Sequence, residues 1–246
     1  MNSHSSSCLP RLASILAIAA FLQGCASAAP SYVAESAFTG FRAITPRPHP
    51  GTNIYKAGKL AFVAWDQLTP DQIRDDLKIQ TSAVYTEKTD ASGKVTYGPA
   101  AVSAEAGSYV VYMDYMKFRP ESVLSDQKVV GTALVGVGLR IRIRVVTNTQ
   151  GLDLGGLFSI GVAAKRNQLR GELSVEVVGL DSKDVTLLVP LTADLSQESL
   201  QGAMLAIASI KAKLFDSDVK LRPYVLAVRK EVESDVPTTE LLKALQ

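Results

Sequence analysis

Apolar and polar residues alternate with a period of two along residues 136–146, GVGLRIRIRVV. The odd positions are aliphatic: Val137, Leu139, Ile141, Ile143 and Val145. The even positions carry three arginines: Arg140, Arg142 and Arg144. Because successive side chains of a strand point to opposite faces, the pattern predicts a strand with one buried and one polar face. Residues 169–177 alternate in the same way and predict a second antiparallel strand in a half-exposed sheet.

Stretches rich in aliphatic, β-branched and aromatic residues predict the remaining strands. They are a buried strand at 58–65, a hairpin around the turn at 90–93, and further strands at 108–118, 157–165, 185–190 and 219–228. Pro223 lies inside the last of these and indicates an edge position or a bulge. The polar residues 121–128 interrupt the pattern and indicate a subdomain boundary.

Two segments carry the signals of helices. Thr69, Pro70 and Gln72 form an N-terminal capping box, which predicts a helix from Pro70 to about Lys78. Ser196 is the expected N-cap of a longer helix over residues 197–215. The apolar stripe expected on this longer helix consists of Leu200, Met204, Ile207, Lys211 and Leu214, with Ala203, Ala208 and Ile210 beside it.

Together these elements predict an α+β fold, an antiparallel β-sheet meander with one long amphipathic helix packed on one face and a second short helix. The expected organisation is a signal peptide over 1–24 and a tether with a Pro-rich extended linker over 25–52. A single α+β domain over 53–230 follows, and then a charged linker with a short C-terminal helix over 231–246.

The N-terminus has the pattern of an export signal. A polar segment with one positive charge at Arg11 precedes Leu12–Leu22, which carries no charge and is too short to span a membrane. Small residues follow, and Ala26–Ala28 would satisfy an ordinary cleavage site. The pattern therefore predicts that the first two dozen residues are removed on export.

Leu22-Gln23-Gly24-Cys25 resembles the lipobox of bacterial lipoproteins. The resemblance covers only these residues and the preceding signal, and it implies cleavage before Cys25, a diacylglycerol on its sulfur and an acyl group on its amine. Several acyl chains make attachment to a bilayer persistent. Ala26 follows the cysteine, and in lipoproteins of this kind its identity favours the outer membrane, facing the periplasm, over the inner membrane.

Residue counts exclude several kinds of chemistry. Besides Cys25 the only cysteine is Cys8, inside the expected signal, so thiol catalysis, disulfides and thiolate metal sites are not expected. His49 is the only histidine after the signal and lies among prolines, where we expect a solvated side chain rather than a catalytic one. The formal net charge of +2 gives no basic excess for nucleic acid. We expect no cofactor, no metal site and no enzyme activity.

The row formed by Arg140, Arg142 and Arg144 is the one unusual feature. Like charges on one strand face repel unless they are paired. One interpretation pairs them with Glu172 and Glu176 on the neighbouring strand, and the other makes them a binding site for an anionic ligand or a partner.

The resulting hypothesis is a membrane-anchored periplasmic lipoprotein that acts as a non-catalytic binding or assembly component of the bacterial envelope. Its expected partners are the lipid bilayer, through Cys25, and another envelope protein. The alternative is an oligomeric secretion or pore-forming subunit, because residues 137–145 and 169–177 approach the length of membrane β-strands. A carboxylate-based hydrolase has no specific support in the sequence.

Overall fold

The computed structural model describes residues 40–56, 58–90, 92–99, 104–181, 192–231 and 240. The chain divides into two compact units, Met1–Tyr32 and Val33–Gln246, and every described residue belongs to the second. The expected signal peptide with Cys25, the strand expected at 185–190 and all but Glu240 of the expected C-terminal helix lie outside the described residues.

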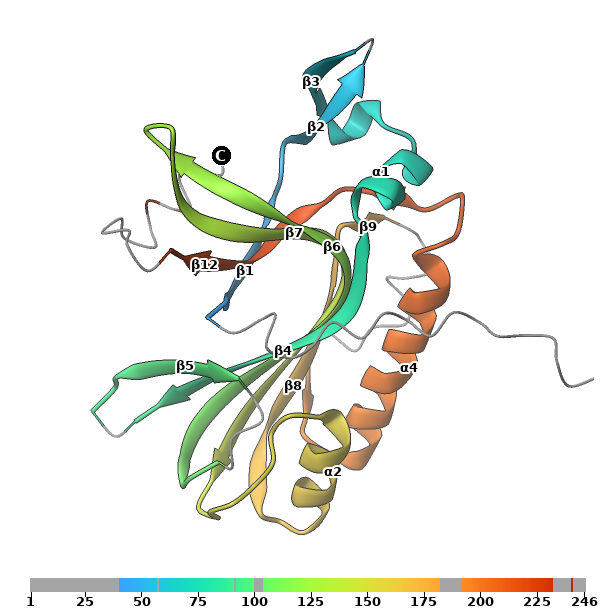
Figure 1. Cartoon of the computed structure of the whole chain (residues 1–246). Coiled ribbons are helices and arrows are strands. Elements are labelled where there is room, and N and C mark those ends of the chain that lie inside the picture. Colours follow the sequence, from blue (N-terminus) through green and yellow to red (C-terminus); the bar gives the residue numbers. More distant parts are fainter. Residues whose placement is uncertain are drawn as a thin grey trace, which may run out of the picture. The chain divides into compact units, whose positions relative to one another are not determined.

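Strands make up most of the described chain (Figure 1). The long strands are β4 (Ile79–Thr89), β6 (Gly107–Ser125), β7 (Lys128–Thr147) and β8 (Leu169–Val178). The shorter strands are β1 (Arg42–Pro48), β2 (Gly51–Lys56), β3 (Lys59–Ala64), β5 (Val95–Pro99), β9 (Leu180–Asp181), β10 (Ala193–Asp194), β11 (Lys220–Leu221) and β12 (Tyr224–Lys230). The helices are α1 (Pro70–Asp76), α2 (Leu157–Lys165), α4 (Gln197–Lys213) and the short 3-10 helix η2 (Trp65–Gln67).

Eight strands form one sheet in the order β1-β12-β7-β6-β4-β5, and β8 joins β7 while β10 joins β8. One edge of β7 pairs with β6 along nearly its whole length. The other edge is shared, because residues 131–136 pair with β12 and residues 138–147 pair with β8. The sheet therefore forks along β7, and Figure 1 shows β12 and β8 leaving it in different directions.

Glycines at the fork allow the close approach that this geometry requires. A Cβ added to Gly138 would overlap the carbonyl oxygen of Tyr115 on β6 and lie 2.7 Å from Cα of Met116. Gly179 has a φ of 73°, a conformation that favours glycine. Its carbonyl oxygen accepts a hydrogen bond from the backbone N–H of Arg222 at 2.8 Å, which ties the end of β8 to the segment before β12. Gly136 and Gly138 thus allow close packing of β7 against β6.

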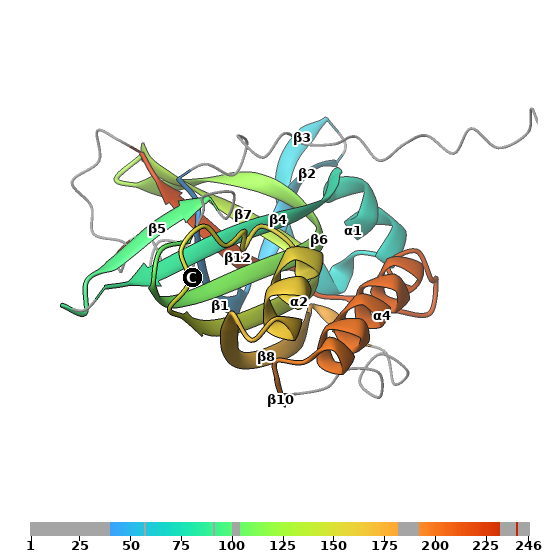
Figure 2. The same ribbon diagram turned by 90° about the horizontal axis from the view of Figure 1, so that it is seen from below.

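The main core lies between one face of the sheet and the helices α2 and α4, which Figures 1 and 2 show side by side against it. The aliphatic odd positions of β7 point into this core, and Val137, Ile141 and Ile143 are fully buried. The predicted alternation along β7 is confirmed. Since α2 and α4 cover this apolar face, it is not available to lipid in this structure.

A second, smaller core lies on the opposite face of the sheet, in the part of that face that β1 and β12 cover. Its buried residues include Met116 and Phe118 of β6, Leu134 of β7, Leu226 of β12 and Phe41 just before β1. This core occupies only the part of the face next to β1 and β12. The rest of the face, toward β5 and β8, carries the polar side chains described below.

The expected subdomain boundary at 121–128 is wrong. β6 and β7 continue through these residues and meet in a tight turn, in which Asp126 and Gln127 have φ values of 50° and 63°. Polar residues occur here because the turn and the ends of the two strands are exposed to solvent.

The expected fold class is also wrong. The described part of the protein is mostly β, with a large eight-stranded antiparallel sheet and the three short helices α1, α2 and α4, instead of an α+β domain with one long and one short helix. The strand content was underestimated because the strands β6 and β7 extend far beyond their apolar cores, and because residues expected to form a linker form β1 and the start of β2.

Residues 157–165 were expected to form a strand and instead form α2. The buried side chains Ile160 and Ala163, with Leu157 and Ala164 partly buried, are three or four residues apart, which is the spacing of a helix. A short apolar run does not distinguish the two structures by itself.

The predicted capping box of Thr69 and Gln72 is confirmed, and so is the predicted N-cap Ser196, which forms a capping box of its own with Ser199. The expected apolar stripe of α4 is rotated. Its buried residues are Ser199, Leu200, Ala203, Ala206 and Ile210, and Leu214 follows at the C-cap. The expected positions Met204 and Lys211 are exposed, because the stripe follows the small alanines that let the helix approach the sheet.

The region expected to be an extended linker enters the sheet. β1 pairs with β12 from Arg42 to Pro48, and its register shifts between Ala43 and Arg47. Proline is tolerated there because β1 is an edge strand with an irregular ladder. The strand expected to be buried at 58–65 is β3, and most of its side chains are exposed or only partly buried.

Candidate functional site

The arginine row lies on the face of the sheet opposite α2 and α4. Arg140, Arg142 and Arg144 of β7 stand beside Asp114, Tyr112 and Val110 of β6 respectively, and beside Glu176, Ser174 and Glu172 of β8. The expected neighbours Glu172 and Glu176 are therefore confirmed in register, but the closest ion pair of the row is made with β6.

Arg140 is a structural residue, buried to 3% exposure together with Asp114 at 2%. Its Nε donates to Oδ1 of Asp114 at 2.7 Å, and a terminal nitrogen donates to Oδ2 at 2.6 Å. Further bonds run to the carbonyl oxygens of Leu226, at 2.8 Å, and Ile44. The guanidinium thus joins β7 to β6, β12 and β1 in a bidentate, fully buried arrangement.

The electrostatics of this pair agree with its geometry. Burial acts to lower the pKa of Arg140, but the charge and the hydrogen bonds of Asp114 outweigh it and raise that pKa. Tyr85 and Glu176 contribute in the same direction. Burial also raises the pKa of Tyr85 well above its usual value, and the charge of Asp114 adds to this effect. Arg140 is therefore permanently charged, and groups of the protein already accept its hydrogen bonds.

Arg142 is only half-buried, and its environment differs from that of Arg140. Its guanidinium lies 5.7 Å from the ring centroid of Tyr112, and that of Arg140 lies 5.5 Å from the same centroid. The Nε of Arg142 is buried and has no hydrogen-bond partner among the described residues. A buried donor without an acceptor is unfavourable by about 1–3 kcal/mol. Arg142 thus has a hydrogen-bond donor that the described residues leave without an acceptor.

Arg144 is exposed and lines a cavity of about 400 Å³ at the end of the sheet. The same cavity is lined by Thr89 and Ser108, by Val110, and by Glu172 on the other side. Arg144 can reach solvent and a ligand, and it lies next to a carboxylate of the neighbouring strand.

Three residues that the sequence did not single out complete this face. Arg42 of β1 lies over the ring of Tyr97 of β5, at 4.2 Å from the centroid. Glu87 of β4 pairs with Tyr97 in the strand register. Burial raises the pKa of Glu87, while the charges of Arg42, Arg142 and Arg140 act to lower it. The contact between Arg42 and Tyr97 places β1 beside β5 at this point.

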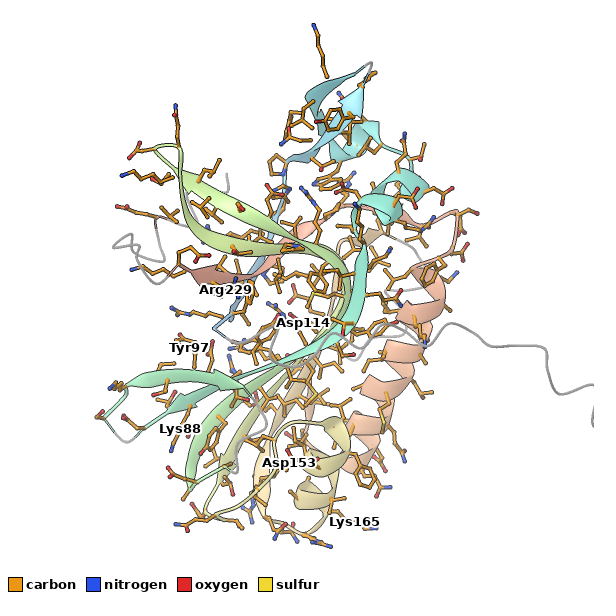
Figure 3. The ribbon with its side chains drawn as sticks, viewed as in Figure 1. Lys88, Tyr97, Asp114, Asp153, Lys165 and Arg229 are labelled. Carbon is orange, nitrogen blue, oxygen red and sulfur yellow. The ribbon has the colours of Figure 1, made fainter. Side chains whose placement is uncertain are left out.

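We call the set Arg42, Glu87, Tyr97, Tyr112, Arg142 and Arg144 the Arg–Tyr face. Figure 3 shows Tyr97 on one arm of the bent sheet, Arg229 on the other, and Asp114 in the bend between them. Burial raises the pKa of both Tyr97 and Tyr112, so both phenols are neutral donors near pH 7. The face offers guanidinium groups, phenol rings and a carboxylate, which suit binding better than covalent chemistry.

His49 does not lie in a solvated linker, and that expectation is wrong. Its side chain is buried at the base of the β2–β3 hairpin, where Nδ1 accepts a hydrogen bond from Trp65 Nε1 at 3.2 Å. Nε2 lies 3.4 Å from Oε1 of Glu121 on β6. Glu121 also pairs with Arg119, and Nε of Arg119 lies 3.0 Å from Asp76 of α1. The network fastens the hairpin and α1 to the sheet.

Comparisons with known proteins identify no relative, since no family model, curated protein or solved structure matches this chain. Within the described ranges, histidines and carboxylates form no group of three that could hold a metal ion. None of the helices in that part of the chain combines the length and apolar character that crossing a membrane would require.

Proposed function

We propose that this protein is a lipid-anchored lipoprotein of the bacterial envelope, attached to the outer membrane and facing the periplasm. In this proposal it acts as a non-catalytic binding component, and the Arg–Tyr face is its binding surface. Acyl chains on Cys25 supply the attachment.

The anchor is supported by the sequence around Cys25. An uncharged core of eleven residues, Leu12–Leu22, leads into Leu22-Gln23-Gly24-Cys25, and the only other cysteine lies before that core. Each methylene buried in a bilayer contributes about 0.8 kcal/mol, so several acyl chains would hold the protein persistently.

The binding role is carried by the buried Nε of Arg142, which has no acceptor among the described residues. An anionic group placed beside Tyr112 would satisfy this donor once the side chain of Arg142 turns its Nε toward the ligand. Arg144 lies two positions along the same strand. A guanidinium presents its donors in a planar fork that matches a carboxylate or a phosphate. We therefore assign the ligand to the class of molecules that carry one of these groups.

The aromatic residues of the face add a second element of recognition. The rings of Tyr97 and Tyr112 lie near the guanidinium groups of Arg42 and Arg142, and their faces attract cations and stack on planar groups. Glu87 limits the net positive charge, so the face would select an anion by geometry rather than by charge alone.

The test uses inorganic phosphate and acetate as probes and follows the Nε–H signals of the arginine side chains by NMR. Phosphate or acetate should shift the signal of Arg142 in a saturable way, while the signal of exposed Arg166 should not move. Arg142→Gln should abolish the saturable binding and change the free energy of unfolding by about 1 kcal/mol or less.

Arg166→Gln is the matched control and should leave binding unchanged. Equal, non-saturating shifts at Arg142 and Arg166 would show that the Arg–Tyr face has no particular affinity for anions. A large loss of stability in Arg142→Gln would mean that Arg142 is structural, like Arg140.

A further inference from the structure

The β2–β3 hairpin carries an exposed apolar surface that no part of the core explains. Tyr55 pairs with Leu60 across the hairpin, and Phe62 lies two residues further along β3, on the same face. The exposed fractions are 79% for Tyr55, 60% for Leu60 and 60% for Phe62. Single exposed apolar residues are ordinary, but a contiguous group of three marks an interaction surface.

The charges of the hairpin have one sign. Lys56 and Lys59 face each other across the turn, and both are exposed. No acidic residue occurs from Gly51 to Trp65. The tip therefore combines an aromatic and aliphatic surface with a local positive charge, although the protein as a whole is nearly neutral.

The base of the hairpin is firmly held. Trp65, directly after β3, donates to buried His49, and its backbone N–H bonds to the carbonyl oxygen of Pro50 at 3.4 Å. His49 in turn contacts Glu121 on β6. Figure 1 shows the hairpin next to α1, reaching away from the main sheet. The apolar surface is thus presented by a fixed support.

We propose that the tip of the β2–β3 hairpin inserts shallowly into a bilayer that contains anionic lipids. Tyr55 and Phe62 would enter the boundary between headgroups and acyl chains, where amphipathic aromatic rings are enriched in membrane proteins. Lys56 and Lys59 would contact the anionic headgroups, with about 1 kcal/mol from each lysine near such a surface.

The size of the surface favours a bilayer over a protein partner. Three side chains cannot supply the roughly 1,200–2,000 Å² that a stable protein interface buries. A weak membrane contact is sufficient if the chain is already held at the bilayer, because attachment raises the effective concentration of the second contact. This contact rests on the proposed anchor only for bringing the membrane close.

The test places a polarity-sensitive fluorophore on the hairpin of the full chain. Cys8→Ser and Cys25→Ser remove both native thiols, and Leu60→Cys then supplies the only labelling site. Leu205→Cys, on the exposed side of α4, is the matched control. The vesicles contain phosphatidylcholine and phosphatidylglycerol in equal amounts, with brominated acyl chains that quench a probe inserted among them.

We expect quenching and a blue shift of the probe at position 60 on these vesicles, weaker quenching on pure phosphatidylcholine, and none at position 205. Phe62→Ser should raise the lipid concentration for half-maximal quenching about tenfold, equivalent to about 1.4 kcal/mol. Lys56→Gln and Lys59→Gln should each raise it about fivefold. Lys94→Gln, in the exposed turn before β5, should have no effect.

A probe at position 60 that stays in water on anionic vesicles would overturn the proposal, and so would equal quenching at both positions. If Phe62→Ser instead converts a dimer to a monomer in sedimentation without vesicles, the hairpin binds a second copy of the chain and the membrane proposal falls. Every variant lacks Cys25, so the vesicles are titrated up to millimolar lipid, which replaces the effective concentration that the anchor would supply. The results then do not depend on lipidation.

Discussion

Three arginines that alternate along β7 have three different environments. Arg140 lies where β1 and β12 cover the sheet, Arg142 lies at the margin of that cover, and Arg144 lies beyond it. The guanidinium of Arg140 donates hydrogen bonds to Asp114 and to backbone carbonyl groups. Arg140 therefore has a structural role, while the binding role proposed for Arg142 and Arg144 stays a proposal.

We expect Arg140→Gln to destabilise the protein by about 3–5 kcal/mol, because the carboxylate of Asp114 would remain buried without its partner. Arg144→Gln, at an exposed position of the same strand, should change stability by about 0.5 kcal/mol or less. Urea unfolding of both variants measures the difference. Similar stabilities of the two variants would contradict the buried pair.

The network around Glu121 predicts a pH dependence of stability. Burial acts to raise the pKa of Glu121, but the hydrogen bond from His49 and the charge and hydrogen bond of Arg119 prevail and lower that pKa. A carboxyl whose pKa is lower in the folded state stabilises the fold above its unfolded pKa, near 4.3. This stabilisation is lost as the pH falls through the lower folded pKa.

The wild type should therefore lose more stability than Glu121→Gln when the pH falls from about 5 to about 3. Melting temperatures of both proteins across this interval give the comparison. Parallel pH profiles would show that the ionisation of Glu121 is not coupled to folding.

At the scale of elements, the shared edge of β7 organises the sheet. Its first half supports β12 and thereby β1, and its second half supports β8. The two cores follow from this division, because the helices cover one face along β8 while β1 and β12 fold over part of the other. The Arg–Tyr face lies on the part of the sheet that is covered neither by the helices nor by β1 and β12.

The orientation of α4 can be tested by placing a charge on either of its sides. Ile210 is buried against the sheet, and Met204 is exposed. Ile210→Asp should unfold the protein or lower its stability by several kcal/mol, because an unpaired carboxylate would enter the core. Met204→Asp should be tolerated. Circular dichroism melts measure both variants, and a folded Ile210→Asp with an unchanged melting temperature would contradict the observed packing.

At the scale of the whole molecule, the proposed functions lie in different parts of the chain. The anchor is assigned to Cys25, the membrane contact to the tip of the β2–β3 hairpin, and ligand binding to the Arg–Tyr face. The hairpin and β1 are adjacent in sequence, so the segment that follows the proposed tether contributes both to the membrane contact and, through Arg42, to the binding surface.

The anchor predicts the chemical nature of the mature N-terminus. Mass spectrometry of the native protein should find Cys25 as the first residue, with acyl chains on it. Cys25→Ser should release the protein from the outer membrane into the soluble periplasmic fraction without changing its melting temperature. An unmodified terminus at Ser27, Ala29 or Pro30 would exclude lipidation.

The sequence by itself determined those features that depend on neighbouring residues. The strict alternation at 136–146 predicted the buried and polar faces of β7, and the capping residues Thr69 and Ser196 located the starts of two helices. These signals are local, because strand pleating and helix capping involve residues a few positions apart. The same kind of signal produced the hypothesis of a lipid anchor.

Only the tertiary structure decided which polar side chains are buried and which strands meet. His49 looked solvated among prolines, yet Trp65 and Glu121 enclose it. Arg42 lies in a segment expected to be a linker, yet it contacts Tyr97. Arg140 forms its ion pair with Asp114 and not with the glutamates of β8. His49 and Glu121 lie on segments far apart in the sequence, and so do Arg42 and Tyr97. Burial and pairing of charges follow from such long-range contacts, which local patterns do not encode.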